Sequence, residues 1–407
     1  MRQDIYRRFA QVLVSVGADL RPGEAAVIQA EPDHRELVLE LAGACYQAGA
    51  RYVWVEYEDP ALERIRAGLS RREYLSQVPD WLYELRRAYG ADRTCVFCLR
   101  TPRLSPEGDG PELRAVRTGE MRSREGFQRS AAGGGVSIVK TVVPGPDWAA
   151  LVFPELDRET ALERLWERFI SICRLDRENP VAAWREHQRL LGQRRERLTA
   201  LELDSLELEG PGTRLSVGLV QGGRWIGGCA ENTRTGGSYV PNIPTEELFC
   251  VPDRRRVEGV VSSTMPLNHG GSLIEGIRLE VREGRVCGCS ARRGAGLLTA
   301  LLNTDEGSRY FGEIALVSVQ SPIYQAGRIF YDTLLDENAV CHMALGRGTP
   351  GVLERGYQLS PEARARAGIN DSAIHVDFMI GSEELNVDGV RRTGERVAIL
   401  RKGDWAL

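Results

Sequence analysis

The run of residues 374–380 constrains the fold of this chain most, because apolar and polar side chains alternate along it. Its apolar members are Ile374, Val376, Phe378 and Ile380. Successive side chains of a strand point to opposite faces, so His375 and Asp377, which stand between them, project from one face. An imidazole and a carboxylate on one strand face are typical ligands of a divalent ion. A buried His–Asp pair that only holds a sheet together explains the same residues equally well.

The length and composition of the chain limit the number of domains and the class of protein to expect. A chain of 407 residues is longer than one hydrophobic core usually serves, so we expect two domains. The hydrophobic share of 42% and the charged share of 27% are ordinary for a soluble globular protein. A net charge of −4 argues against general nucleic-acid binding, and no apolar run approaches the length of a membrane span. We therefore expect neither nucleic acid nor a membrane as a partner.

The cysteines indicate a reducing compartment. There are nine, an odd number, and the amino terminus does not resemble a signal peptide. We therefore expect a cytoplasmic protein with reduced thiols. Cys95 and Cys98 form a C-x-x-C pair, but they lie in the apolar run 94–99, which predicts a buried strand rather than a redox or metal site.

The first part of the chain alternates between strands and helices. Apolar runs at residues 25–30, 51–57, 94–99 and 136–143 predict strands. Strands separated by helices favour a mainly parallel sheet with helices on its faces. We therefore expect an N-terminal α/β domain over residues 1–155.

Two charged helices follow this domain, and beyond them the alternation of strands and helices gives way to short β runs. Residues 157–175 carry a helical apolar stripe, and Pro180 opens a second helix at a position where its missing N–H costs nothing. We interpret residues 156–200 as a helical linker. Beyond it, short β runs such as 277–281 dominate, so residues 201–407 are expected to form a β-rich α+β domain.

Three further segments carry acidic or histidine side chains in contexts too specific for a scaffold. They are an acidic pair at the end of the proline-stiffened loop 241–249, Glu313 where an apolar strand begins, and residues 336–346. Each of these segments, taken alone, is explained as ordinary surface charge. With His375 and Asp377 they supply enough oxygen and nitrogen ligands for two adjacent divalent ions.

These segments resemble the family of co-catalytic metallopeptidases that includes aminopeptidase T, aminopeptidase S and PepS. The similarity runs along the whole chain and includes residues 180–184, 210–213 and 321–323. The resemblance implies a chain of α/β plus α+β class, with a flavodoxin-like parallel-sheet N-terminal domain and a β-rich, metal-bearing C-terminal domain.

The resemblance also implies two divalent metal ions, zinc or cobalt, with magnesium or manganese as alternatives. The implied metal ligands are Glu247, Glu313, Glu337, His342, His375 and Asp377. Glu313 would be shared by both ions, and Glu247 is preferred as a ligand to its neighbour Glu246, which is the candidate general base. Two ions about 3.5–4 Å apart lower the pKa of a shared water and polarise a scissile carbonyl.

Three positions depart from the family pattern. The family's tyrosine, seven residues after the histidine at 342, falls on Thr349 here. A phenol at that position donates to the developing oxyanion, whereas a threonine hydroxyl is shorter. Arg214 stands where an aspartate is expected, and His269 lies in an unusual loop, where a surface position and a substrate contact are both open. The metal set is intact, but the ordinary substrate is in question.

The function that the resemblance implies is a cytoplasmic, homodimeric metallo-aminopeptidase that releases N-terminal residues from short peptides. The departures leave open a paralogue recruited to a specialised pathway, acting on one amide or peptide-like intermediate. A non-catalytic, metal-stabilised binding protein of the same fold is the third alternative.

Overall fold

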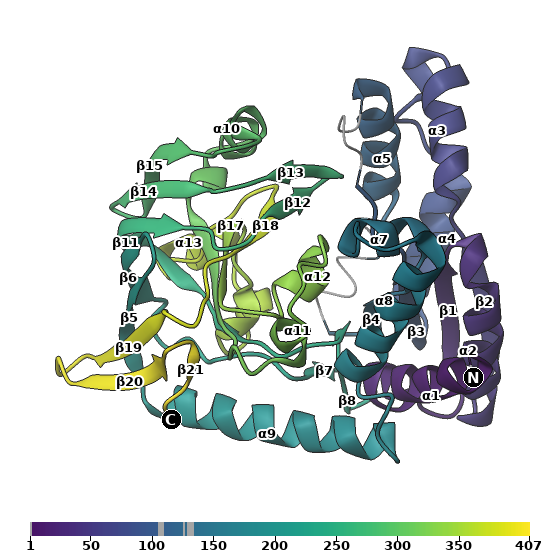
Figure 1. The fold of residues 1–407 in the computed structure, drawn as a ribbon, viewed down its shortest axis with the longest axis horizontal. Helices are drawn as coiled ribbons and strands as arrows, with labels where there is room; N and C mark the ends of the chain where they lie inside the picture. The colour runs from purple at the N-terminus through teal and green to yellow at the C-terminus, as the bar shows by residue number, and fades with distance from the viewer. Residues whose placement is uncertain (1, 105–109, 125–126, 128–133) are drawn as a thin grey trace. The chain divides into compact units, whose positions relative to one another are not determined.

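The chain folds into two compact units (Figure 1). The computed structural model describes residues 2–104, 110–124, 127 and 134–407. Unit 1 comprises Met1–Glu186 and Cys229–Pro244, and unit 2 comprises His187–Gly228 and Thr245–Leu407. The long helix α9 (Pro180–Ala200) therefore contributes residues to both units.

Unit 1 contains a parallel five-stranded sheet in the order β2-β1-β3-β4-β9. Its strands are β1 (Ala25–Ala30), β2 (Tyr52–Tyr57), β3 (Thr94–Arg100), β4 (Ser137–Val142) and β9 (Asn242–Ile243). The helices of its first segment are α1 (Arg2–Val12), α2 (Arg35–Gln47), α3 (Pro60–Leu69), α4 (Asp80–Ala91), α5 (Pro111–Ser123), α7 (Pro146–Val152) and α8 (Arg158–Ile172). A short hairpin pairs β7 (Ala230–Asn232) with β8 (Gly237–Tyr239). The parallel sheet with its helices confirms the α/β character expected of the first part of the chain.

The helix expected at residues 157–175 is α8, and its start has a local cause. The carboxylate of Asp157 accepts hydrogen bonds from the backbone N–H groups of Glu159 and Thr160, which have no partner inside the helix. Its apolar stripe, including Trp166 and Phe169, is buried. The next helix, α9, begins at Pro180 as expected.

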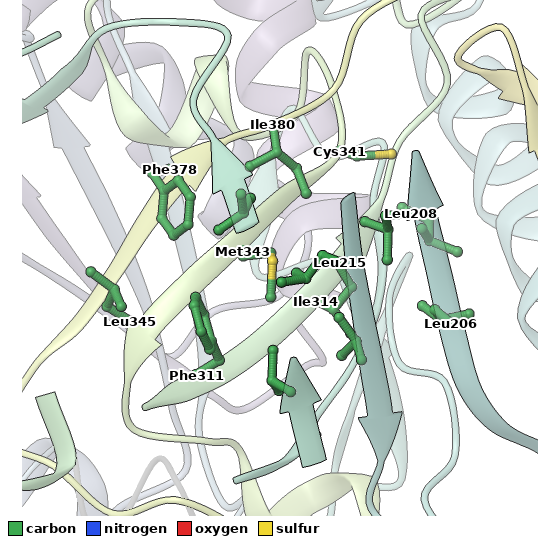
Figure 2. Packing of buried hydrophobic residues seen from close by; sticks show 14 of the residues in the cluster. Leu206, Leu208, Leu215, Phe311, Ile314, Cys341, Met343, Leu345, Phe378 and Ile380 are labelled. Atoms are coloured by element: carbon green, nitrogen blue, oxygen red, sulfur yellow. The ribbon is translucent and has the colours of Figure 1, made fainter. Parts of the chain in front are cut away.

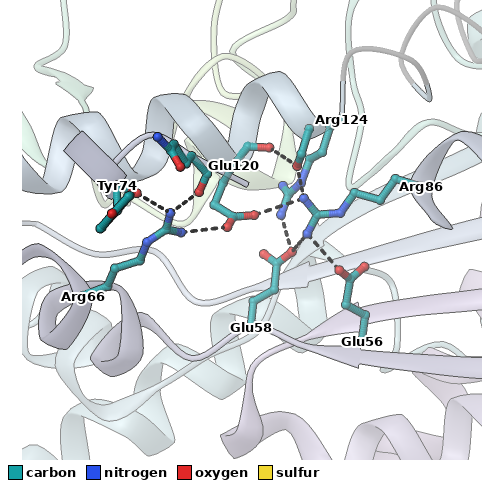
Figure 3. A network of polar contacts seen from close by, with 9 residues as sticks. Glu56, Glu58, Arg66, Tyr74, Arg86, Glu120 and Arg124 are labelled. Atoms are coloured by element: carbon teal, nitrogen blue, oxygen red, sulfur yellow. Dashed lines mark hydrogen bonds and ion pairs between the residues drawn. The ribbon is translucent and has the colours of Figure 1, made fainter. Parts of the chain in front are cut away.

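A buried arginine joins the helices of unit 1 to the end of β2 (Figure 3). Arg86 on α4 has a side chain that is only 4% exposed, and its guanidinium lies 2.8 Å from Glu56 and 3.0 Å from Glu120. It also lies 3.5 Å from Glu58, which pairs in turn with Arg124. One cation thus ties α4 and α5 to the carboxyl end of β2, and the surrounding carboxylates compensate for its burial.

We expect Arg86→Leu to lower the free energy of unfolding of unit 1 by about 3 kcal/mol, because it leaves Glu56 and Glu120 in a partly buried site without their cation. Arg87→Leu is the matched control, since the Arg87 side chain is 69% exposed, and it should change stability by less than about 0.5 kcal/mol. Amide hydrogen exchange in β3 measures both values. Equal effects of the two substitutions would contradict the structural role of Arg86.

Unit 2 is built mainly from antiparallel sheets. A four-stranded sheet has the order β10 (Leu248–Cys250), β16 (Phe311–Leu316), β17 (His342–Gly346) and β18 (His375–Met379). An eight-stranded sheet has the order β15 (Arg285–Ser290), β14 (Arg278–Arg282), β11 (Pro252–Ser262), β6 (Thr213–Leu219), β5 (Leu203–Gly210), β19 (Asn386–Arg391), β20 (Arg396–Arg401) and β21 (Asp404–Trp405). Unit 2 also contains the hairpin β12 (Leu267–His269) and β13 (Ser272–Ile274), and the α-helices α10 (Ala295–Leu302), α11 (Pro322–Gln325), α12 (Thr333–Asp336) and α13 (Pro361–Arg366).

The two large sheets of unit 2 share one hydrophobic core (Figure 2). Leu206 and Leu215 come from β5 and β6 of the larger sheet, and Ile314, Met343 and Phe378 come from β16, β17 and β18 of the smaller one. These side chains are almost fully buried, and each contributes about 1.5–3 kcal/mol of hydrophobic stabilisation. One face of the four-stranded sheet is therefore committed to the core, which leaves the opposite face for other chemistry.

Two further features considered in the sequence are the C-x-x-C pair and the length of the apolar helices. Cys95 and Cys98 lie on β3 as expected, and burial raises the pKa of the Cys98 thiol to about 11, so the reactive thiolate is disfavoured. Among the residues that the structure describes, no helix combines the length and the apolar character that crossing a bilayer requires.

Candidate metal centre

The face of the four-stranded sheet that turns away from the core carries the histidines and carboxylates singled out in the sequence. On β18, Val376 and Phe378 enter the core, so His375 and Asp377 project from the other face, as the alternation predicts. Neighbouring strands and the residue before β10 follow the same rule. They add Glu313 from β16, His342 from β17 and Glu247. The strand period thus gathers these residues on one face of unit 2.

The strand register leaves room between two of these carboxylates. Glu313 pairs with Ala344, and Ala344 pairs with Asp377, so a fully buried alanine lies between the two acids. Any larger side chain there would occupy the space between the carboxylate groups. The small residue at the centre of the row is consistent with a site that holds something other than protein atoms.

The side chains form two groups that share Glu313. In the first, His342 Nε2 lies 3.1 Å from Glu247 Oε2 and 3.4 Å from Glu313 Oε1. In the second, His375 Nε2 lies 3.7 Å from Glu313 Oε2 and 3.5 Å from Asp377 Oδ1. Within each group of three, the ligand atoms lie within 4.8 Å of one another. The two oxygens of Glu313 therefore face different histidines.

The orientation of His375 is set by the backbone of the adjacent strand end. Its Nδ1 lies 2.8 Å from the carbonyl oxygen of Arg347 and donates to it, because a carbonyl only accepts. This leaves Nε2 to face the carboxylates of Glu313 and Asp377. The same carbonyl comes so close to β16 that a Cβ on Gly312 would lie 2.2 Å from it, so only glycine fits beside Glu313.

Burial and the neighbouring charges shift the pKa values of the residues in the site. Burial, with Asp377 and Glu247 nearby, raises the pKa of Glu313 to about 7. Burial lowers the pKa of His375, but the Asp377 carboxylate more than offsets this and the pKa rises to about 10. Burial likewise lowers the pKa of His342, and Glu247 and Glu313 raise it well above its ordinary value. In the absence of other cations the histidines thus gain protons that balance the carboxylates.

The unsatisfied atoms of the site fit divalent metal ions. Among the described residues, His342 Nε2 and Asp377 Oδ1 are buried without a hydrogen-bond partner, since their close contacts lack hydrogen-bond geometry. A buried polar atom without a hydrogen-bond partner costs free energy, and a metal ion would bind the Asp377 oxygen directly and replace the proton on the His342 nitrogen. Ligand atoms about 2.1 Å from an ion in tetrahedral geometry lie about 3.4 Å apart. The observed separations of 3.1–3.7 Å match this value.

Glu337 lies beside these groups rather than within either. It follows directly after helix α12 and is half-buried. Burial raises its pKa well above the ordinary value, and the nearby carboxylates of Asp377 and Glu247 raise it further. Four carboxylates (Glu247, Glu313, Glu337 and Asp377) thus share one region of unit 2, and two divalent cations would neutralise them.

The two residues expected to take part in catalysis lie outside the two groups. Glu246 turns toward helix α9, where its Oε2 lies 3.4 Å from His187 Nε2. Thr349 is half-buried at the start of a short 3₁₀ turn (Pro350–Val352), two residues after Arg347.

Two residues near the centre were not anticipated from the sequence. His187 contacts the loop that carries Glu246, and Asn338 accepts a hydrogen bond of 2.7 Å from the Glu246 backbone N–H. His187 stands among charged residues in a helix and resembles a solvent-exposed position. Its spacing from Trp184 and Leu191, which places it on the buried face of α9, is the signal that could have identified it.

The other departures from the family pattern lie on different elements. Arg214 is on β6, where its exposed side chain pairs with Glu209 at 3.0 Å. His269 ends the short strand β12, and burial lowers its pKa, so the neutral ring is favoured.

Comparison with known proteins shows matches along the full length of the chain. The family model for thermophilic metalloprotease (M29) matches residues 2–405. Aminopeptidase T of Thermus thermophilus is 40% identical over 405 residues, covering 98% of each chain. Aminopeptidase 2 of Geobacillus stearothermophilus is 37% identical over 401 residues, covering 98% of this chain and 97% of that protein. The solved structure of wild-type AmpT from Thermus thermophilus superposes with a TM-score of 0.91 at 36% identity and covers 100% of both chains.

Proposed function

Because this chain belongs to the thermophilic metalloprotease family M29, we propose that it is a metallo-aminopeptidase that removes N-terminal residues from short peptides. Its full-length relatives are named aminopeptidases, and the family is one of metalloproteases. The observation that carries the proposal is the Glu313 carboxylate, whose two oxygens face two different histidines inside two ligand groups.

We assign one ion to Glu247, Glu313 and His342, and a second to Glu313, His375 and Asp377. Glu313 would bridge the ions, and Glu337 is an additional ligand. The two groups, the unpartnered atoms of His342 and Asp377, and the excess of carboxylates over cations support this assignment. Nitrogen and oxygen ligands in small coordination shells favour zinc or cobalt, with magnesium and manganese as alternatives.

The metal ions and the residues around them would have separate roles in the reaction. When bound, the ions would lower the pKa of a shared water and polarise the peptide carbonyl. Glu246 is the general base that accepts the proton of the attacking water. The Arg347 carbonyl keeps His375 in one tautomer. His375 is also the ligand with the most exposed side chain, at 28%, so a peptide would approach the cluster from its side.

We also propose a fold class for unit 1, a cellular location and an oligomeric state. The strand order β2-β1-β3-β4-β9 supports a flavodoxin-like class for unit 1. All nine cysteines are free, which supports a cytoplasmic location. We also infer a homodimer from the family resemblance, and light scattering of the purified protein tests it.

The purified protein should bind two divalent ions per chain, and their removal should abolish activity. We expect dialysis against a chelator to lower the hydrolysis of a leucyl dipeptide to background, because the proposed mechanism uses a metal-activated water as the nucleophile. Zinc or cobalt should restore it. Metal content by mass spectrometry and the initial rate of hydrolysis are the measurements, and the same dipeptide with an acetylated N-terminus is the control that should stay uncut.

Undiminished activity of the metal-free protein would refute the mechanism, and a single ion per chain would refute the bridging role of Glu313. Two bound ions without cleavage of any peptide would favour the second candidate function, an amide hydrolase of a specialised pathway. The observation that favours this second candidate is Thr349, where the family has a tyrosine.

A further inference from the structure

One histidine interrupts the apolar face of helix α9. Trp184, Leu191 and Leu198 lie at helical spacing on that face and are fully buried. His187 occupies the same face, three residues after Trp184 and four before Leu191, and its side chain is only 12% exposed. A polar ring at such a position costs free energy unless its nitrogen atoms have partners.

The partners of this ring lie on the loop that carries the candidate base. His187 Nε2 lies 2.8 Å from the carbonyl oxygen of Thr245, so this nitrogen carries the proton and donates it. The same N–H faces Glu246 Oε2 at 3.4 Å. One donor therefore contacts both the backbone before Glu246 and the carboxylate of Glu246 itself.

The loop is held from a second side by a fully buried amide. Asn338 Oδ1 accepts from the backbone N–H of Glu246 at 2.7 Å, and its Nδ2 donates to the carbonyl of Leu334 at 2.9 Å. Asn338 fixes the main chain of Glu246, whereas His187 contacts its carboxylate. The Glu246 side chain is itself only 10% exposed, and His187 is in contact with its carboxylate inside this enclosed position.

We infer that His187 is a positioning residue that directs the carboxylate of Glu246 toward the attacking water. The inference rests on the proposed role of Glu246 as the general base. The His187 N–H that faces Glu246 Oε2 at 3.4 Å restricts the rotation of this carboxylate and keeps one oxygen engaged, which leaves the other oxygen for the proton transfer. The contact belongs to the catalytic step, so its loss should change kcat more than KM.

Three substitutions of His187 separate this role from helix packing. His187→Phe keeps a ring but removes the donor, and kcat on a leucyl dipeptide should fall roughly tenfold to hundredfold. His187→Gln places an amide N–H the same number of bonds from Cα as Nε2, so it should restore kcat to within about threefold of the parent. His187→Asn reaches only as far as Nδ1 and should behave like the phenylalanine variant. Gln188→Leu on the same helix is the control with unchanged kcat.

Bound metal and KM are measured for every variant. Two ions per chain and an unchanged KM, together with the lower kcat, support a positioning role. Loss of metal from His187→Phe would overturn it, because the effect would then pass through the neighbouring Glu247. Equal kcat values for the glutamine and asparagine variants would also overturn it, and this comparison holds even where the phenylalanine variant does not fold.

A Glu246→Ala background tests whether the histidine acts through the carboxylate. In that background His187→Phe should cause no further loss of kcat, because the group it positions is absent. An equal loss in both backgrounds would overturn the inference and leave the role of Glu246 intact. Parent-like activity of Glu246→Ala alone would instead refute the base assignment in the proposed function, and this inference with it.

Discussion

Glu313→Gln is expected to lower kcat by at least about a thousandfold and to reduce the bound metal below two ions per chain. The amide keeps the size of the side chain but supplies only one weak, neutral ligand oxygen. The two Glu313 oxygens lie 3.4 and 3.7 Å from two different histidines, so both ligand groups lose a charged member at once. Several kcal/mol of transition-state stabilisation depend on the ions that these groups hold.

Glu337→Gln provides the comparison, since Glu337 lies beside the groups and serves at most one ion. Its loss should cost about tenfold to hundredfold in kcat. Glu354→Gln replaces an exposed glutamate and should leave kcat and metal content unchanged. Kinetics at saturating metal and metal analysis after dialysis measure the three variants, and circular dichroism checks their folding. Equally mild effects at Glu313 and Glu337 would show that the bridging ligand has been misassigned.

The alternation of residues 374–380 was enough to predict which face of β18 would carry His375 and Asp377. The physical reason is that a strand in a half-buried sheet has only two faces, and the apolar residues Val376 and Phe378 must take the one that meets the core. On β16 a bulge between Phe311 and Glu313 breaks the alternation, so the period of two applies only from Glu313 onward, where Ile314 and Leu316 enter the core. Local pattern thus predicts the direction of a side chain when one side of the strand is buried.

Local pattern could not predict which side chains meet across strands. The placement of Ala344 between Glu313 and Asp377 follows from a register between segments far apart in the sequence. The partner of Glu246 was missed for the same reason, because His187 comes from helix α9, well before the loop it contacts. The family resemblance supplied the ligand set, and the strand period explains why these residues gather on one face.

Thr349→Tyr should raise kcat on simple peptides by about 10²–10³-fold, the usual contribution of one oxyanion donor. Thr349 stands where the resemblance to the family implies a tyrosine, two residues after Arg347, whose carbonyl contacts His375. A phenol reaches several ångströms farther than a threonine hydroxyl. Because the donated hydrogen bond forms mainly as the carbonyl oxygen gains charge, KM should change little.

Thr349→Phe is the matched control for this gain, because it adds the same ring without the hydroxyl group. Its kcat should stay at the level of the parent, which assigns the gain to the donor rather than to the bulk of the ring. The kinetic constants of the three proteins are compared on a leucyl dipeptide at saturating metal. A parent that already turns over rapidly, with no gain from the tyrosine, would show that another group stabilises the oxyanion. Equal gains from tyrosine and phenylalanine would show that packing near the 3₁₀ turn at Pro350–Val352, and not a hydrogen bond, limits the reaction.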